Sequence, residues 1–161
     1  MNTFLEAHKK MLLKLIRHQV DFILIGGYAV IYYGYSRSTV DMDIWLKPDN
    51  TNKQNLLKVL EEIDINENDL TEFLKLNFTK ANGFFIGEKP NRIDFLTQIT
   101  GLEWNECARN VAYLSLEDVK IPVLRFRDLI VNKMLSDSLK DRADIDELQK
   151  INKHRKPPFE I

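Results

Sequence analysis

Cysteine is almost absent from the 161 residues, and Cys107 has no second cysteine with which to form an internal disulfide. The chain also lacks an apolar stretch of the roughly 18 residues that a membrane-spanning helix needs. Charged side chains interrupt its first turns, so we expect neither a secretory signal nor a membrane partner. These absences indicate a reducing cytoplasm as the compartment, with Cys107 buried as a small apolar side chain.

No charge of either sign predominates, because 23 Lys and Arg balance 24 Asp and Glu for a net charge of −1. The protein as a whole therefore does not attract nucleic acid, which weakens any proposal of a long polynucleotide as partner. Basic residues do gather near the C-terminus, at Lys150, Lys153, His154, Arg155 and Lys156. No aromatic residues interleave this cluster, so it is interpreted as a solvated chain end. The three histidines lack the spacing of zinc ligands.

Repeats and linkers rich in Gly, Pro or Ser are also missing, which predicts one domain over residues 1–161. Its core is expected at about 20–100 and a helical C-terminal part at about 125–155. The order of helical and strand patterns predicts an α+β (mixed α/β) fold, a small twisted mixed sheet covered mainly on one side by helices. Helices are expected at 3–19, 28–33, 52–63, 69–76, 127–138 and 141–153. Strands are expected at 22–25, 40–46, 83–86, 92–97, 112–116 and 119–124.

The segment from Val40 to Leu46 alternates apolar and polar side chains, so Asp41 and Asp43 project from one face of a strand. Two carboxylates that point together repel one another, and a divalent cation such as Mg²⁺ relieves the repulsion. If the strand of Asp94 lies beside this one, three carboxylates converge and can hold two metal ions about 4 Å apart. The alternative for an isolated Asp-x-Asp is a solvated strand face.

Gly26 and Gly27 close an apolar strand and open a helix. Backbone amides there are free donors, and glycine lets a phosphate approach them closely. A tight strand-to-helix turn without a ligand is the alternative. Arg37 and Thr39, shortly before the aspartates, supply a guanidinium and a hydroxyl that suit a triphosphate, although Arg37 could equally pair with a surface acid.

Lys133 follows Leu129 by four residues, on or beside the apolar stripe of its expected helix. A lysine there either extends to solvent or meets an anion. In the next expected helix Asp141 and Asp144 share a stripe with apolar residues, so at least one of them faces inward. Trp45 lies on the aspartate face, where it either stacks on a base or packs as a partly buried aromatic side chain.

These motifs together resemble the signature of the DNA polymerase β-type nucleotidyltransferase superfamily. The likeness rests on Ile25-Gly26-Gly27-Tyr28-Ala29-Val30, Tyr33-Gly34, Arg37, Thr39 and Asp41-Met42-Asp43-Ile44, followed by Ile93-Asp94-Phe95. Within the superfamily the sequence is most similar to the bacterial abortive-infection and toxin-type branch. Members of that branch carry a Gly-Gly, an Arg-x-Thr-x-Asp-x-Asp and a late Lys-Asp segment.

The resemblance implies transfer of a nucleoside monophosphate from a nucleoside triphosphate to an acceptor hydroxyl, with release of pyrophosphate. It implies two Mg²⁺ ions, with Mn²⁺ as a substitute, on Asp41, Asp43 and Asp94, the last of which also helps to deprotonate the hydroxyl. The residues implied in nucleotide binding are Gly26, Gly27, Arg37, Thr39 and Lys133, with Asp141 or Asp144 in support.

The acceptor stays open at this point, among a tRNA end, a protein hydroxyl and a small molecule. A non-catalytic nucleotide-binding protein, or one partner of a toxin–antitoxin pair, is the alternative function. The chain leaves little room for a dedicated acceptor-binding domain, which motivates that alternative.

Overall fold

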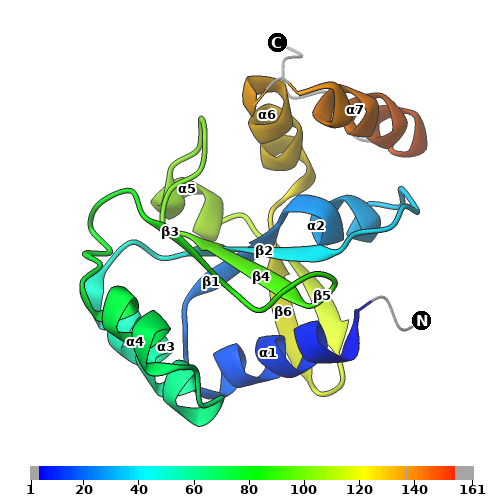
Figure 1. The fold of residues 1–161 in the computed structure, drawn as a ribbon. Coiled ribbons are helices and arrows are strands. Elements are labelled where there is room, and N and C mark those ends of the chain that lie inside the picture. The colour runs from blue at the N-terminus through cyan, green and yellow to red at the C-terminus, as the bar shows by residue number, and fades with distance from the viewer. Residues whose placement is uncertain (1–3, 137, 155–161) are drawn as a thin grey trace.

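The computed structural model describes residues 4–136 and 138–154, and within them six strands form one mixed sheet. Their order is β3-β4-β2-β1-β6-β5 (Figure 1). The strands are β1 Phe22–Ile25, β2 Asp41–Leu46, β3 Gly83–Ile86, β4 Arg92–Leu96, β5 Ala112–Leu116 and β6 Val119–Val123. The pairs β2–β4 and β1–β6 are parallel, and the two expected hairpins, β3–β4 and β5–β6, are confirmed as antiparallel.

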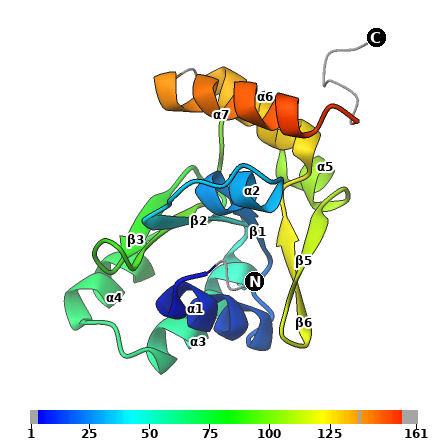
Figure 2. The ribbon, with the colours of Figure 1, turned by 90° about the vertical axis from the view of Figure 1, so that its right-hand side faces the viewer.

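Helices cover both faces of this sheet, which corrects the expectation of helices mainly on one side. Figure 2 shows α1 and α3 below the sheet, and α2 with α6 and α7 above it. The helices are α1 Glu6–Arg17, α2 Gly26–Tyr32, α3 Asn50–Glu62, α4 Glu67–Leu74, α5 Trp104–Ala108, α6 Phe126–Ser136 and α7 Leu139–Ile151. The mixed α/β fold itself is as predicted. Within the described part of the chain, no helix has the length and apolar character needed to cross a membrane.

Local chemistry explains where several helices begin. The side chains of Asp49, Asn66 and Ser138 accept backbone N–H groups at the starts of α3, α4 and α7, and each such cap is worth about 1 kcal/mol. All four residues of β1 are buried, as its apolar run predicts. Val40, expected inside a strand, precedes β2 and is 43% exposed. Thr3, Arg155 and Lys156 lie outside the described residues.

A buried histidine ties α1 to the elements that carry the candidate site. His8 is completely buried, its Nδ1 lies 2.7 Å from the Tyr28 hydroxyl of α2, and its Nε2 lies 3.1 Å from the Arg92 carbonyl oxygen of β4. Burial lowers the pKa of His8, so the neutral ring is favoured. These contacts hold the start of β4 against α2.

Candidate active site

Three aspartates lie on one face of two neighbouring strands. β2 and β4 pair in parallel with Asp43 opposite Asp94, and strand alternation places Asp41 on the same face. Asp43 also lies opposite Ile25, the last residue of β1. The expected neighbourhood of the two strands is therefore confirmed, and the carboxylates lie close to the turn at Gly26. Their role as metal ligands stays a prediction.

The charge of this face is only partly compensated. Burial, and then the negative charges of Asp94 and Asp41, raise the pKa of Asp43 to about 6, while Lys133 and Lys140 act in the opposite direction. Asp41 Oδ1 is buried and has no hydrogen-bond partner among the described residues. A buried carboxylate oxygen without a donor is costly, and a hard divalent cation is the partner that such oxygens suit. The donor set therefore fits a Mg²⁺ or Mn²⁺ ion.

Arg92 changes the expected geometry of the third carboxylate. Its Nε and Nη2 donate to both oxygens of Asp94 at 2.9–3.2 Å, and its guanidinium lies 3.8 Å from the ring centre of Phe85. The described residues contain no group of three or more His, Cys, Asp or Glu side chains gathered as metal ligands. The three aspartates share a face, but their carboxylates do not form such a group in this conformation, in which Asp94 pairs with Arg92.

The glycine pair is required by close approach of two side chains. A Cβ at Gly26, where φ is +67°, would lie 2.2 Å from Asp43 Oδ2, and one at Gly27 would lie 2.6 Å from Thr39 Oγ1. The Thr39 hydroxyl donates to the Asp41 carbonyl oxygen at 2.9 Å. The two glycines therefore let the aspartate strand and the segment before it pack directly against the start of α2, whatever ligand binds there.

Lys133 is buried and paired with both candidate acids of α7. Its Nζ lies 3.0 Å from Asp141 Oδ1 and 2.9 Å from Asp144 Oδ2. Asp144, 1% exposed, also accepts a hydrogen bond at Oδ2 from Arg37 Nη2, at 3.1 Å, and its Oδ1 forms an ion pair with Arg37 Nε, at 3.0 Å. Arg37 thus pairs with a buried acid rather than a surface one, and both acids contact the lysine. The network joins α6, α7 and the segment before β2.

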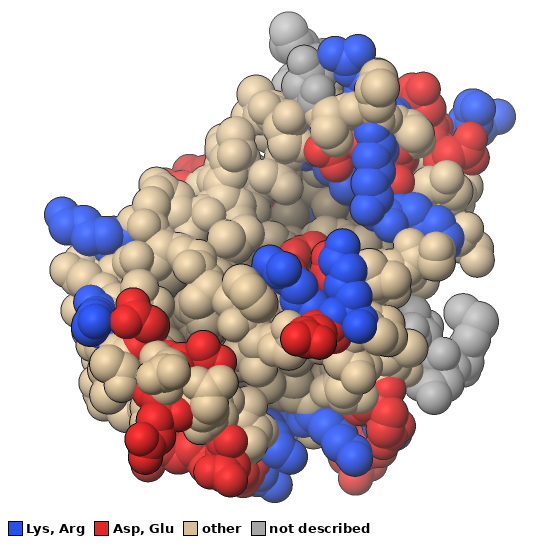
Figure 3. All heavy atoms as spheres, viewed as in Figure 1, with Lys and Arg blue, Asp and Glu red and all other residues tan. Residues whose placement is uncertain are grey.

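A cavity of about 370 Å³ lies between the sheet and the C-terminal helices. Figure 3 shows side chains of both charge signs gathered around a hollow on this face. Six of the residues predicted for the site line it, namely Gly26, Gly27, Arg37, Asp43, Lys133 and Asp141. Asp41, Asp94, Thr39 and Asp144 are not part of the lining. Three cations, Arg37, Lys133 and Lys140, and two carboxylates, Asp43 and Asp141, line the cavity, and the pKa of Asp43 is raised. We call it the phosphate cavity, after the ligand that the sequence motif leads us to expect.

Two solved structures share this arrangement of elements. The lincosamide antibiotic adenylyltransferase LnuA, in a lincomycin-bound structure, matches with a TM-score of 0.58 at 18% identity, over 94% of this chain and 100% of that one. An antigenic nucleotidyltransferase-like protein from Paracoccidioides brasiliensis matches with a TM-score of 0.50 at 16% identity, over 89% and 72%. The chain has a nucleotidyltransferase-type fold. No protein-family model and no curated protein matches the sequence.

Within this nucleotidyltransferase-type fold, some lining residues had no signal in the sequence. Gln98, Asn132 and Ser136 line the phosphate cavity, but their residue types occur on any polar surface. Lys140, next to Asp141, could have been found as a second cation of the late Lys-Asp segment. The structure also decides the role of Trp45, which is 1% exposed and donates from Nε1 to the Thr97 carbonyl oxygen at 3.3 Å. Its ring is packed and leaves no face for a base.

Proposed function

We propose that this protein transfers a nucleoside monophosphate from a nucleoside triphosphate to the hydroxyl of an acceptor and releases pyrophosphate. The observation that carries the proposal is the shared lining of one cavity by Asp43 and Lys133, with Asp94 opposite Asp43 on the neighbouring strand and Asp41 on the same face. The shared fold with an adenylyltransferase supports it. Placement in the abortive-infection and toxin-type branch stays a prediction from the motif.

The cations of the cavity would bind the triphosphate. Lys133 is held in place by two carboxylates, and Arg37 by one of them, so neither side chain must be ordered when a nucleotide binds. Lys140 adds a third positive charge to the lining. Gly26 and Gly27 also line the cavity, where they would lie beside the phosphates.

Two Mg²⁺ ions, or Mn²⁺ in their place, would be held by Asp41, Asp43 and Asp94. Bound there, such ions supply Lewis-acid polarisation of the phosphoryl group and neutralise charge on the leaving group. Asp43 lines the cavity proposed for the phosphates, and Arg92 would have to release Asp94 before that carboxylate could act. Asp94 is then the carboxylate placed to take the hydroxyl proton.

ATP is the proposed donor and a small molecule the proposed acceptor. The structurally similar LnuA is an adenylyltransferase whose structure contains lincomycin, a small molecule. A net charge of −1 gives a tRNA end no general attraction.

The test is incubation of the protein with α-labelled nucleoside triphosphates, Mg²⁺ or Mn²⁺ and hydroxylated small molecules, followed by detection of labelled product and pyrophosphate. Asp41→Asn and Asp43→Asn should each lower transfer by at least about 100-fold. Asp118→Asn, at the exposed turn between β5 and β6, is the matched control and should keep full activity. Transfer that survives both site substitutions refutes the proposal.

Nucleotide binding without catalysis, including a role in a toxin–antitoxin pair, is the second candidate. The hold of Arg92 on both oxygens of Asp94 favours it, because that bond keeps one of the three carboxylates from a metal ion. Calorimetry separates the two functions. Nucleotide binding that depends on Lys133, with no pyrophosphate released in the presence of any acceptor, supports the binding protein.

A further inference from the structure

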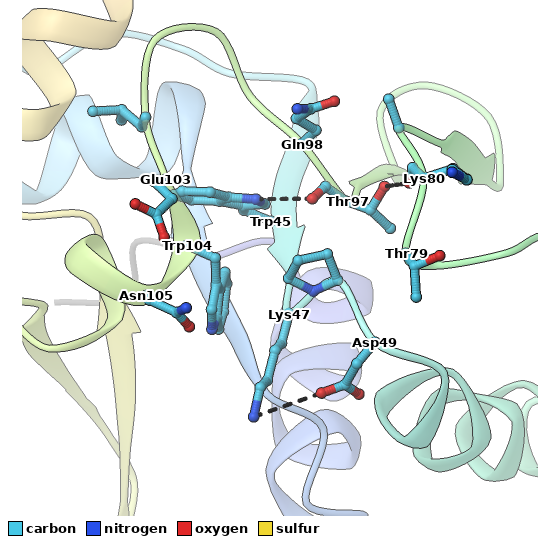
Figure 4. A pocket seen from close by; sticks show the side chains of 13 residues that line it. Trp45, Lys47, Asp49, Thr79, Lys80, Thr97, Gln98, Glu103, Trp104 and Asn105 are labelled. Atoms are coloured by element: carbon cyan, nitrogen blue, oxygen red, sulfur yellow. Dashed lines mark hydrogen bonds and ion pairs between the residues drawn. The ribbon is translucent and has the colours of Figure 1, made fainter.

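A second cavity, of about 390 Å³, opens on the same side of the sheet beyond the aspartates. Figure 4 shows it between the end of β2, the segment that follows β4, and α5. Trp45, Lys47, Lys80, Gln98, Glu103 and Trp104 are among its lining residues. Its volume falls within the roughly 300–1,000 Å³ of small-molecule sites. We call it the Trp104 cavity.

The Trp104 cavity adjoins the phosphate cavity. Gln98 lines both, and on β2 Asp43 lines the one and Trp45, two residues later on the same face, lines the other. Two residues of a strand span about 7 Å. A small molecule in the Trp104 cavity would therefore extend one end to the carboxylates without entering the space of the triphosphate.

The wall between the two cavities is fixed by α6. Thr100, of the segment that follows β4, lines the phosphate cavity, and its carbonyl oxygen accepts a hydrogen bond from Asn132 Nδ2 at 3.0 Å. Leu135 packs so closely on Gly101 that a Cβ there would lie 2.1 Å from Leu135 Cδ1. Leu102, one residue further on, lines the Trp104 cavity. The two spaces are thus distinct cavities that share Gln98 in their lining.

The chemistry of the Trp104 cavity differs from that of its neighbour. Its charged lining side chains are two lysines, Lys47 and Lys80, and two carboxylates, Asp49 and Glu103, so it carries no net charge. A polyphosphate gains nothing there, whereas an uncharged or zwitterionic molecule is well matched. The cavity's amide side chains, Gln98 and Asn105, and the carboxylate of Glu103 suit a saturated ring with several hydroxyls, because hydroxyls form hydrogen bonds with such groups.

We propose that the Trp104 cavity is the acceptor site and binds a small polyhydroxylated ring compound of sugar-like chemistry. This inference rests on the proposed nucleotidyl transfer and names the acceptor class. In the reaction, an acceptor hydroxyl oxygen bonds to the α-phosphorus and the bond from that phosphorus to the bridging oxygen of the β-phosphate breaks. Pyrophosphate leaves with the electron pair, and the hydroxyl proton passes to a carboxylate of the site.

Fluorescence provides a readout that does not depend on activity. The chain has two tryptophans, Trp45 and Trp104, and both line this cavity. The probes are methyl glycosides of glucose, galactose and mannose, an amino sugar, and lincomycin. At least one of them should change the tryptophan emission of the full chain in a saturable way. ATP with Mg²⁺ should leave the emission nearly unchanged, since no tryptophan lines the phosphate cavity.

Glu103→Gln and its matched control Glu106→Gln locate the binding. Both residues are exposed and lie one turn apart at α5, but only Glu103 lines the cavity. Glu103→Gln should raise the Kd of the bound probe about 10-fold and leave the Kd of ATP unchanged, as the loss of one good hydrogen bond predicts. Gln98→Ala should likewise raise the Kd of the probe. Glu106→Gln should change neither constant.

The outcomes separate this inference from the proposed transfer. Probe binding that is weakened by Glu103→Gln, with no nucleotidylated product, supports the acceptor site and contradicts the transfer. If a labelled product forms and its acceptor KM is the same in Glu103→Gln and Gln98→Ala as in the wild type, the transfer is supported and the proposed acceptor site is overturned. Tryptophan emission that responds to ATP alone, or to none of the probes, also overturns the proposed acceptor site.

Discussion

Asp43 lies where its charge is least favourable, so replacing it should make the metal-free protein more stable. Burial, followed by the neighbouring Asp94 and Asp41, raises its pKa from 3.8 to about 6. The folded protein therefore binds this proton more tightly than the unfolded chain does, and ionisation of Asp43 costs stability as the pH rises. Asp43→Asn keeps the shape of the side chain and removes the charge.

The size of the effect follows from the two pKa values. The interval from 3.8 to about 6 corresponds to about 3 kcal/mol once both states are fully ionised, at pH 8. At pH 5 the folded state is still mostly protonated at this position, and the cost falls to about 1.5 kcal/mol. The free energy of unfolding of Asp43→Asn should therefore exceed that of the wild type by up to about 3 kcal/mol at pH 8, and by about half of that at pH 5.

Urea denaturation in EDTA, at both pH values, measures this gain, with Asp118→Asn as the control for a lost surface charge. Mg²⁺ should then stabilise the wild type and leave Asp43→Asn unchanged, because a ligand stabilises only the state that binds it. A variant that is less stable than the wild type at pH 8, or a gain of equal size at both pH values, refutes the electrostatic reasoning. The charge would then be compensated within the fold.

Three further substitutions test other parts of the site. Asp144→Asn breaks a buried pair with the lysine of α6 and should lower the free energy of unfolding by about 3–5 kcal/mol; a loss below 1 kcal/mol in urea denaturation contradicts this. Gly26→Ala places a methyl group 2.2 Å from Asp43 Oδ2 in a left-handed backbone. It should lower the free energy of unfolding by at least about 1–2 kcal/mol and weaken nucleotide binding. An unchanged Tm and Kd for ATP would show that the turn adapts. Arg92→Gln frees Asp94 from a guanidinium and should tighten Mn²⁺ binding in calorimetry, whereas weaker binding would mean that Arg92 positions the carboxylate for the metal.

Local patterns in the sequence were sufficient for much of the site. Period-two alternation places Asp41 and Asp43 on one face, because side chains of a strand point alternately to its two sides. A lysine on or beside an apolar helical stripe either extends to solvent or meets an anion, and the structure shows the second for Lys133, which pairs with Asp141 and Asp144. These inferences hold because each depends on residues within a few positions of one another.

Other features depended on elements distant in the sequence. The pairing of Arg92 with Asp94 is one of them, since the place of the guanidinium is also set by Phe85 on the next strand. α5, Trp104–Ala108, is too short for a periodic pattern, so the Trp104 cavity had no signal. The helices cover both faces of the sheet because α6 and α7 return over α2, which the order of elements alone left undecided.

The sequence by itself therefore determined which side chains share a strand face or a helix stripe, and that a phosphate-compatible turn precedes an aspartate pair. Only the tertiary structure decided that a Cβ at Gly26 would strike Asp43, and that Arg37 and Lys133 meet at Asp144. Periodicity is a property of neighbouring residues, whereas a cavity forms where segments far apart in the chain pack together. The two cavities and the charges around them are for that reason results of the fold.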